Sequence, residues 1–168
     1  MIYNSVQNAD KGIIARHIIN TNFEKLYDTG LVALNLLNTY SISLTANTST
    51  KVNFVDNIVA VSNDIFKYSD TNKTITILKN GLYYFLGDCV LETSNANEIL
   101  EFILVKNGIE TNIKSIITSS GSGKKNTVGY NGFVELNQND TIEFYVKVEE
   151  NTTLTVYFSN IGLEKKVF

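Results

Sequence analysis

Hydrophobic and polar residues alternate with a period of two over most of the chain from residue 41 onward. The alternation predicts strands over 41–46, 51–55, 65–68, 74–78, 82–91, 99–105, 109–118, 128–136, 142–149 and 153–161. Turns rich in Asn, Gly and Asp separate these segments, and Asn107-Gly108 is a strong hairpin signal. Short strands at such regular spacing predict an all-β antiparallel sandwich or barrel.

The segment 82–91 is hydrophobic on both faces, unlike 142–149, where only one face is hydrophobic. Its first face carries Leu82, Tyr84 and Leu86, and its second face carries Tyr83 and Phe85. A strand of this kind has to be covered twice, once by its own core and once by another surface. We interpret that other surface as a second copy of the chain. A larger core and a contact with the N-terminal segment are the alternatives.

The first 40 residues follow a helical period instead. Asp10 is a candidate helix cap, and Thr21 with Glu24 has the spacing of a capping box. Leu31, Leu34 and Leu37 extend the hydrophobic stripe past Gly30, although Gly30 can equally end the helix. We therefore expect a helical anchor over 1–40 and a knob domain over 41–168. The anchor either packs on the knob or docks on a partner through the hydrophobic residues Ile13, Ile14, Ile18, Phe23, Leu26 and Tyr27.

The charge, cysteine and histidine content argues against several classes of function. Charged residues make up 18% of the chain, the net charge is −3 and Arg16 is the single arginine, a composition that disfavours nucleic-acid binding. Cys89 is the single cysteine, so no intrachain disulfide can form. His17 is the single histidine, which argues against a serine or cysteine triad. No hydrophobic run is long enough to span a bilayer, and residues 1–20 lack the pattern of a signal peptide.

Other motifs are weaker. The run Gly121-Ser122-Gly123-Lys124-Lys125 departs from a phosphate-binding loop at two positions, so we interpret 119–126 as a flexible contact loop. A calcium site using Asp56, Asp64 and Asp70 lacks the spacing of a calcium loop. A glycosidase carboxylate pair remains open, although we interpret the acidic residues as solvated: Glu92, Glu98, Glu101 and Glu135. We expect no catalytic residue, metal or cofactor.

Several motifs carry a family resemblance. The strand 81–85 reads Gly-Leu-Tyr-Tyr-Phe, and 104–108 reads Leu-Val-Lys-Asn-Gly. Further on, 132–136 reads Gly-Phe-Val-Glu-Leu, an Asn139-Asp140 turn leads into Thr-Ile-Glu-Phe at 141–144, and Val-Tyr-Phe follows at 156–158. Over 51–168 this pattern resembles the tumour-necrosis-factor-like (TNF-like) jelly roll, in the form of the globular head of the complement first component.

The resemblance implies a jelly-roll sandwich of about nine or ten antiparallel strands that assembles as a homotrimer, with one sheet of each protomer facing the three-fold axis. It implies subunit contacts at Tyr83, Phe85, Phe133 and Tyr157, and the glycine-flanked Tyr130 joins them as a surface aromatic. No collagen repeat precedes the knob. In its place, the N-terminal segment looks like the short anchors of bacteriophage fibre and spike proteins.

These observations lead us to expect a trimeric structural protein of a phage virion, a head fibre or fibre knob. It would be assembled in the host cytoplasm and exposed on the virion surface, since a virion protein needs no export signal. The N-terminal segment would dock on a capsid or tail protein. Host-surface glycans would meet Tyr145, Ser122, Lys124 and Lys125. The alternatives are a bacterial surface or spore-coat trimer and a soluble carbohydrate-binding module.

Overall fold

The computed structural model describes residues 30–36, 38–53 and 57–166. These residues form twelve strands and no helix, and therefore no helix able to cross a membrane. The strands are β1 (Leu31–Leu36), β2 (Tyr40–Leu44), β3 (Thr50–Lys51), β4 (Asn57–Val61), β5 (Phe66–Ser69), β6 (Thr74–Ile77), β7 (Gly81–Thr93), β8 (Ile99–Lys106), β9 (Ile109–Thr118), β10 (Asn126–Leu136), β11 (Thr141–Val148) and β12 (Thr152–Lys166).

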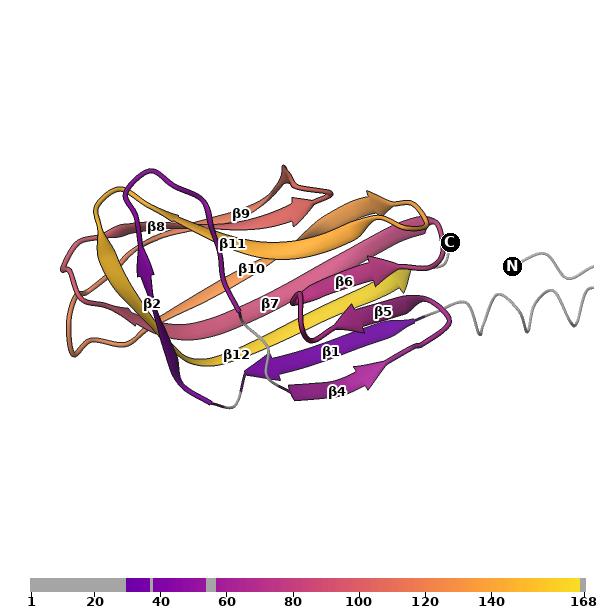
Figure 1. Cartoon of the computed structure of the whole chain (residues 1–168), viewed down its shortest axis with the longest axis horizontal. Helices are drawn as coiled ribbons and strands as arrows, with labels where there is room; N and C mark the ends of the chain where they lie inside the picture. The colour runs from indigo at the N-terminus through magenta and orange to yellow at the C-terminus, as the bar shows by residue number, and fades with distance from the viewer. Residues whose placement is uncertain (1–29, 37, 54–56, 167–168) are drawn as a thin grey trace, which may run out of the picture.

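The strands form two antiparallel sheets, as Figure 1 shows. Sheet A has the order β10-β7-β12-β1-β4, with β2 paired to the first part of β12. Sheet B has the order β5-β6-β11-β8-β9, with β3 paired to β11. Neighbours in each sheet are often distant in sequence, as in a jelly roll, so the predicted all-β antiparallel fold is confirmed.

Aromatic rings from both sheets fill the core between them. The Phe85 ring stacks on Tyr130 at 5.3 Å and on Phe144 at 5.4 Å between centroids. At the edge of sheet B formed by β5, the Phe66 ring contacts the Tyr83 ring edge to face, with 5.5 Å between the ring centroids. Because Phe85 and Tyr130 come from sheet A and Phe144 comes from sheet B, this stack joins the two layers.

The two ends of the sandwich differ in what they carry. At one end, the backbone N–H of Lys165 donates to the carbonyl of Gly30 at 3.0 Å, so the start of β1 and the end of β12 lie side by side. At the other end, the 94–98 loop meets the 119–126 loop through Asn97 N–H and the Ser119 carbonyl at 3.0 Å. The start of β1 therefore lies at the end of the sandwich opposite the 119–126 loop (Figure 1).

The structure corrects the predicted boundary at residue 40. Residues 31–36 form β1, which lies inside sheet A between β12 and β4 instead of continuing a helix. Val32, Leu34 and Leu36 are buried and alternate with the outward Ala33 and Asn35. The run Leu-Val-Ala-Leu-Asn-Leu fits a period of two as well as a helical stripe, and pairing with β12 selects the strand. The earlier part of the predicted helical segment, including the expected docking set of residues 13–27, lies outside the described residues.

Candidate functional site

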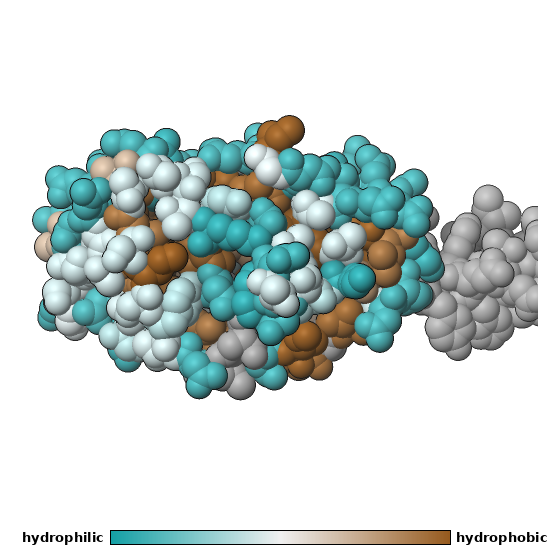
Figure 2. All heavy atoms as spheres, in the orientation of Figure 1, coloured by the Kyte–Doolittle hydropathy of each residue, from teal (hydrophilic) through white to brown (hydrophobic). Residues whose placement is uncertain are grey.

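The outer face of sheet A is the most hydrophobic surface of the described part of the chain. The described part of the chain exposes eight large hydrophobic side chains. Two of them, Ile109 and Ile116, belong to β9 of sheet B. The other six come from strands of sheet A: Leu31, Ile58, Val59, Leu86, Phe133 and Phe158. Of these, Ile58 lies opposite the inward-facing Leu34 and therefore does not belong to the outer face. In Figure 2, hydrophobic surface lies along the lower edge over β4 and at the tip of the β8–β9 turn.

Strand register brings these residues into rows across the sheet. Phe133 of β10 lies opposite Tyr84 of β7, and their ring centroids are 4.9 Å apart. Tyr84 in turn lies opposite Glu164 of β12, whose other neighbour is Leu31. Lys166 Nζ lies 2.6 Å from Glu164 Oε2 and 5.4 Å from the Tyr84 ring centroid. This row therefore presents two adjacent aromatic rings with a neutralised charge pair beside them.

The next row is almost flat. Leu86, which is 54% exposed, lies opposite Gly162 of β12, and Gly162 lies opposite Ala33 of β1. A Cβ built at Gly162 would meet no atom closer than 3.8 Å. Leu86 thus projects beside the small residues Gly162 and Ala33. A side chain of another molecule can pack against Leu86 in the space that these two residues leave.

The size of this face suits a protein partner. With strands about 4.8 Å apart and rows extending about 25 Å along β7, its planar footprint is on the order of 500 Å². A standard interface removes about 800 Å² of accessible surface from each partner. Because side chains give a face more accessible area than its planar footprint, the two areas are of the same order.

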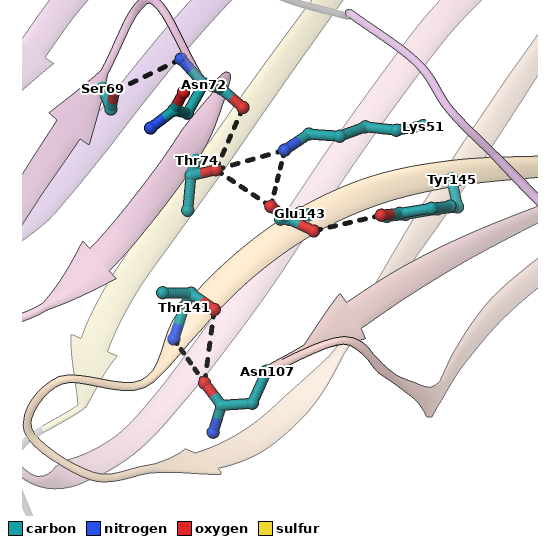
Figure 3. A network of polar contacts seen from close by, with 8 residues as sticks. All are labelled: Lys51, Ser69, Asn72, Thr74, Asn107, Thr141, Glu143 and Tyr145. Atoms are coloured by element: carbon teal, nitrogen blue, oxygen red, sulfur yellow. Dashed lines mark hydrogen bonds and ion pairs between the residues drawn. The ribbon is translucent and has the colours of Figure 1, made fainter.

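The outer face of sheet B, by contrast, carries a polar network over β3, β6 and β11, although Ile116 of β9 is exposed on the same sheet. Lys51 of β3 contacts Glu143 of β11 with Nζ 2.5 Å from Oε1, and the Thr74 hydroxyl donates to the same oxygen at 3.0 Å (Figure 3). Burial raises the pKa of Glu143, but the hydrogen bonds from Lys51 and Thr74 outweigh it and leave the pKa below its ordinary value. This network holds β3, β6 and β11 together.

Three residues predicted at the subunit contacts lie in the protomer core instead. Tyr83 and Phe85 are fully buried, and Tyr130 is 7% exposed. The Tyr83 hydroxyl donates to the Lys79 carbonyl at 2.5 Å. These side chains point toward sheet B and cannot contact another subunit, so the prediction chose the wrong face of β7. Phe133, at 59% exposure, is the one predicted contact that stands fully on the surface.

Tyr157, the fifth predicted contact residue, belongs to a cluster at the loop end. Its hydroxyl donates to Glu92 Oε2 at 2.8 Å, and Lys125 Nζ lies 4.0 Å from its ring centroid. The other oxygen of Glu92 accepts from the backbone N–H of Gly123 at 2.6 Å. Glu92 therefore ties the 119–126 loop to the outer face of sheet A, while Ser122 and Lys124 remain exposed on the loop.

Tyr145, proposed with this loop as a glycan contact, lies apart from it. It is half-buried on β11, and its hydroxyl donates to Glu143 Oε2 at 3.2 Å (Figure 3). Its cross-strand partner is Ile103, four positions along β8 from Ile99, where the strand meets the loop end. Four residues of strand span about 13 Å, so the structure does not combine Tyr145 with the loop in one site.

The described residues offer little reactive chemistry. Cys89 is buried, and burial together with the nearby Asp88 charge raises the pKa of its thiol. No group of three or more His, Cys, Asp or Glu side chains in the described ranges is placed to hold a metal ion. Of the weighed calcium residues, Asp64 lies 3.6 Å from Lys79 Nζ and Asp70 lies 2.5 Å from Lys73 Nζ. Asp56 lies outside the described residues.

Comparison with known proteins identifies the fold. No family model matches the chain, and no curated relative was found. Among solved structures, murine APRIL (pH 5.0) matches with a TM-score of 0.58 and 16% identity, covering 83% of this chain and 100% of that one. Eiger TNF from S. frugiperda matches with a TM-score of 0.60 and 16% identity, covering 82% and 91%. The chain therefore has a TNF-like jelly-roll fold, as the sequence motifs indicated.

Proposed function

We propose that this chain forms the homotrimeric knob of a virion fibre and is anchored to a capsid or tail protein through its N-terminal segment. The observation that carries the proposal is the gathering of exposed hydrophobic side chains on the outer face of sheet A. A monomer in water gains nothing from exposing Leu86 and Phe133 side by side with Tyr84. Three copies that turn this face toward a common axis would remove it from water, an arrangement consistent with a TNF-like jelly roll.

The two ends of the sandwich support a fibre geometry. The N-terminal segment joins at the end where Gly30 pairs with Lys165, and the exposed Ser122 and Lys124 lie at the opposite end. In a trimer with parallel chains, all three N-terminal segments would leave on one side and all three 119–126 loops would gather on the other. Three weak contacts with host-surface glycans would then gain affinity by avidity.

The first test is the solution mass of the full chain by light scattering after size exclusion, measured from micromolar to high micromolar concentration. One chain has a mass of 18.8 kDa, so a trimer is expected at 56.4 kDa. A mass of 18.8 kDa at every concentration would overturn the proposed trimer.

The second test addresses the virion role. A fusion of residues 1–29 to an unrelated soluble trimer should bind virions from which the fibre has been removed, with the unfused trimer as its control. Binding by the isolated knob, residues 30–168, in place of the 1–29 fusion would contradict docking through the N-terminal segment. Binding by neither would contradict the virion proposal itself.

A further inference from the structure

A polar row crosses the hydrophobic face of sheet A from edge to edge. Asp88 of β7 lies opposite Gly129 of β10 on one side and Asn160 of β12 on the other. Asn160 lies opposite Asn35 of β1, and Asn35 lies opposite Asn57 of β4. The Asn57 amide also reaches the Asn35 side-chain oxygen at 3.4 Å. Directly opposed residues share a face, so the five form one continuous row.

Rows that carry hydrophobic side chains flank this polar row on both sides. On one side stands Leu86, between Asn131 of β10 and Gly162 of β12, with Tyr84 and Phe133 beyond it. On the other side, Val90 of β7 lies opposite Phe158 of β12. The polar row therefore runs through the surface that the proposed trimer would cover, and covering it removes water from a carboxylate and three amides.

Asp88 makes the energy of association depend on what this row faces in another copy. Its two cross-strand neighbours, Gly129 and Asn160, carry no charge, so the row contains one negative charge and only amide groups as hydrogen-bond donors. A carboxylate pressed against Leu or Phe in an interface loses its hydration without compensation. A carboxylate that meets Asn amides of another copy keeps hydrogen bonds. The energetic difference between these two arrangements depends on how the copies are aligned along the strands.

We propose that the row Asp88–Asn160–Asn35–Asn57 fixes the alignment and the number of copies in the assembly, an inference that rests on the self-association proposed above. A polar residue in an otherwise hydrophobic interface sets register and oligomeric state at a cost in stability, as a single buried Asn does in coiled coils. In the correct alignment each Asp88 faces amides from a neighbouring copy. A shift along the strands places it against hydrophobic rows, and that assembly is disfavoured.

The test replaces the row by hydrophobic residues in the full chain. The double variant Asp88→Leu with Asn160→Leu is expected to assemble at least as tightly as the wild type but in two or more oligomeric states, counted by native mass spectrometry. Asp88→Asn, which keeps the polar row, is expected to retain one state. Asn112→Leu places the same side chain on the exposed face of β9 in sheet B and should leave the distribution unchanged.

The outcomes separate this inference from the trimer itself. A wild type that is monomeric at all concentrations overturns the proposed trimer and this inference with it. A trimeric wild type whose double variant still forms one state of the same stoichiometry overturns this inference alone. Multiple states in both the double variant and Asn112→Leu would show that any added exposed leucine causes nonspecific association. That result would also overturn this inference. Circular dichroism checks that each variant keeps its sheet content.

Discussion

Tyr130 lies directly opposite Gly87 across the β7–β10 pair, and its ring occupies the space that a side chain at position 87 would fill. A Cβ built on Gly87 would come within 2.4 Å of Tyr130 Cε2 and 2.6 Å of Cζ. The ring cannot move away freely, because it stacks on Phe85 at 5.3 Å and on Phe102 at 6.3 Å between centroids. Gly87 is therefore a packing requirement of the aromatic stack that joins the two sheets.

Gly87→Ala is expected to destabilise the protomer. The added methyl group overpacks a core with no room to relax, a change that typically costs about 1–3 kcal/mol. The free energy of unfolding, measured by urea titration, should fall by that amount. Gly129→Ala is the matched control on the neighbouring strand, since a Cβ there meets only the Gly87 carbonyl oxygen at 3.8 Å. Equal losses in the two variants would contradict the packing role of Gly87.

Phe133→Asp is expected to break the assembly and leave the protomer folded. The side chain is 59% exposed in the single chain, so the charge stays in water until a second copy covers it. The mass by light scattering should fall from that of a trimer toward 18.8 kDa, with an unchanged circular dichroism spectrum.

Two controls fix the location of the contact. Ile116→Asp changes an equally exposed residue, at 66%, on sheet B and should keep the wild-type mass. Tyr83→Asp should unfold the protomer, because Tyr83 is fully buried. A trimer that survives Phe133→Asp and dissociates with Ile116→Asp would place the interface on sheet B.

Cys89 is expected to resist thiol reagents in the native protein. The side chain is buried in sheet A and its raised pKa leaves little of the reactive thiolate at neutral pH. Ellman's reagent should report no free thiol before denaturation and one thiol per chain in guanidinium chloride. Rapid labelling of the native protein would contradict the packing of β7 against the core.

Asp140 is expected to make stability depend on pH. Burial raises the pKa of Asp140, but hydrogen bonds from Lys106, the Asn137 N–H and Asn107 outweigh it and hold the pKa below its ordinary value. A lowered folded-state pKa means that the stabilisation is complete above the unfolded-state pKa of about 4 and is lost as the pH falls through the folded-state pKa. Asp140→Asn should lower the free energy of unfolding by about 2 kcal/mol at pH 7.

The pH dependence supplies the check on this effect. The difference between wild type and Asp140→Asn should shrink as the pH falls below about 4. Asp70→Asn is the control, because its ion pair with Lys73 is exposed on a turn and contributes at most about 1 kcal/mol. A wild-type advantage that persists unchanged to pH 2 would show that shape, and not charge, accounts for the role of Asp140.

Turn residues and hydrophobic alternation predicted much of this fold, because both depend on residues that are close together in the sequence. The Asn107-Gly108 turn needs positive φ at both residues, and the structure has 52° and 76° there. Alternation likewise located most strands from β2 onward within a few residues, but it missed β4 at Asn57–Val61, since the only strand predicted between β2 and β5 covered 51–55. The β1 strand was missed because Val32, Leu34 and Leu36 overlap a helical stripe through Leu31 and Leu34, and only pairing with β12 separates the two patterns.

The sequence predicted that an exposed hydrophobic surface exists, but of the contact residues it named only Phe133 stands fully on that surface. Both faces of β7 are hydrophobic, so the sequence could show that two coverings are needed without showing which face meets sheet B. That choice is made by the partners of β7, since Gly87 accepts the Tyr130 ring only on the inner side. The polar row was also invisible, because Asp88, Asn160 and Asn35 come together only through the registers of three strands.

Glu92 is expected to control the order of the 119–126 loop. One of its oxygens accepts from the Gly123 N–H at 2.6 Å and the other accepts from the Tyr157 hydroxyl at 2.8 Å. Glu92→Ala removes both acceptors, so the Gly123 amide should exchange its hydrogen faster than in the wild type. Hydrogen exchange followed by NMR measures this rate, with the Gly108 amide in the β8–β9 turn as an internal reference.

Tyr157→Phe separates the two bonds: it removes the hydroxyl and keeps the Gly123 acceptor, so exchange at Gly123 should stay near the wild-type rate. Fast exchange in Tyr157→Phe and not in Glu92→Ala would mean that the Tyr157 hydroxyl, and not the Glu92 carboxylate, orders the loop.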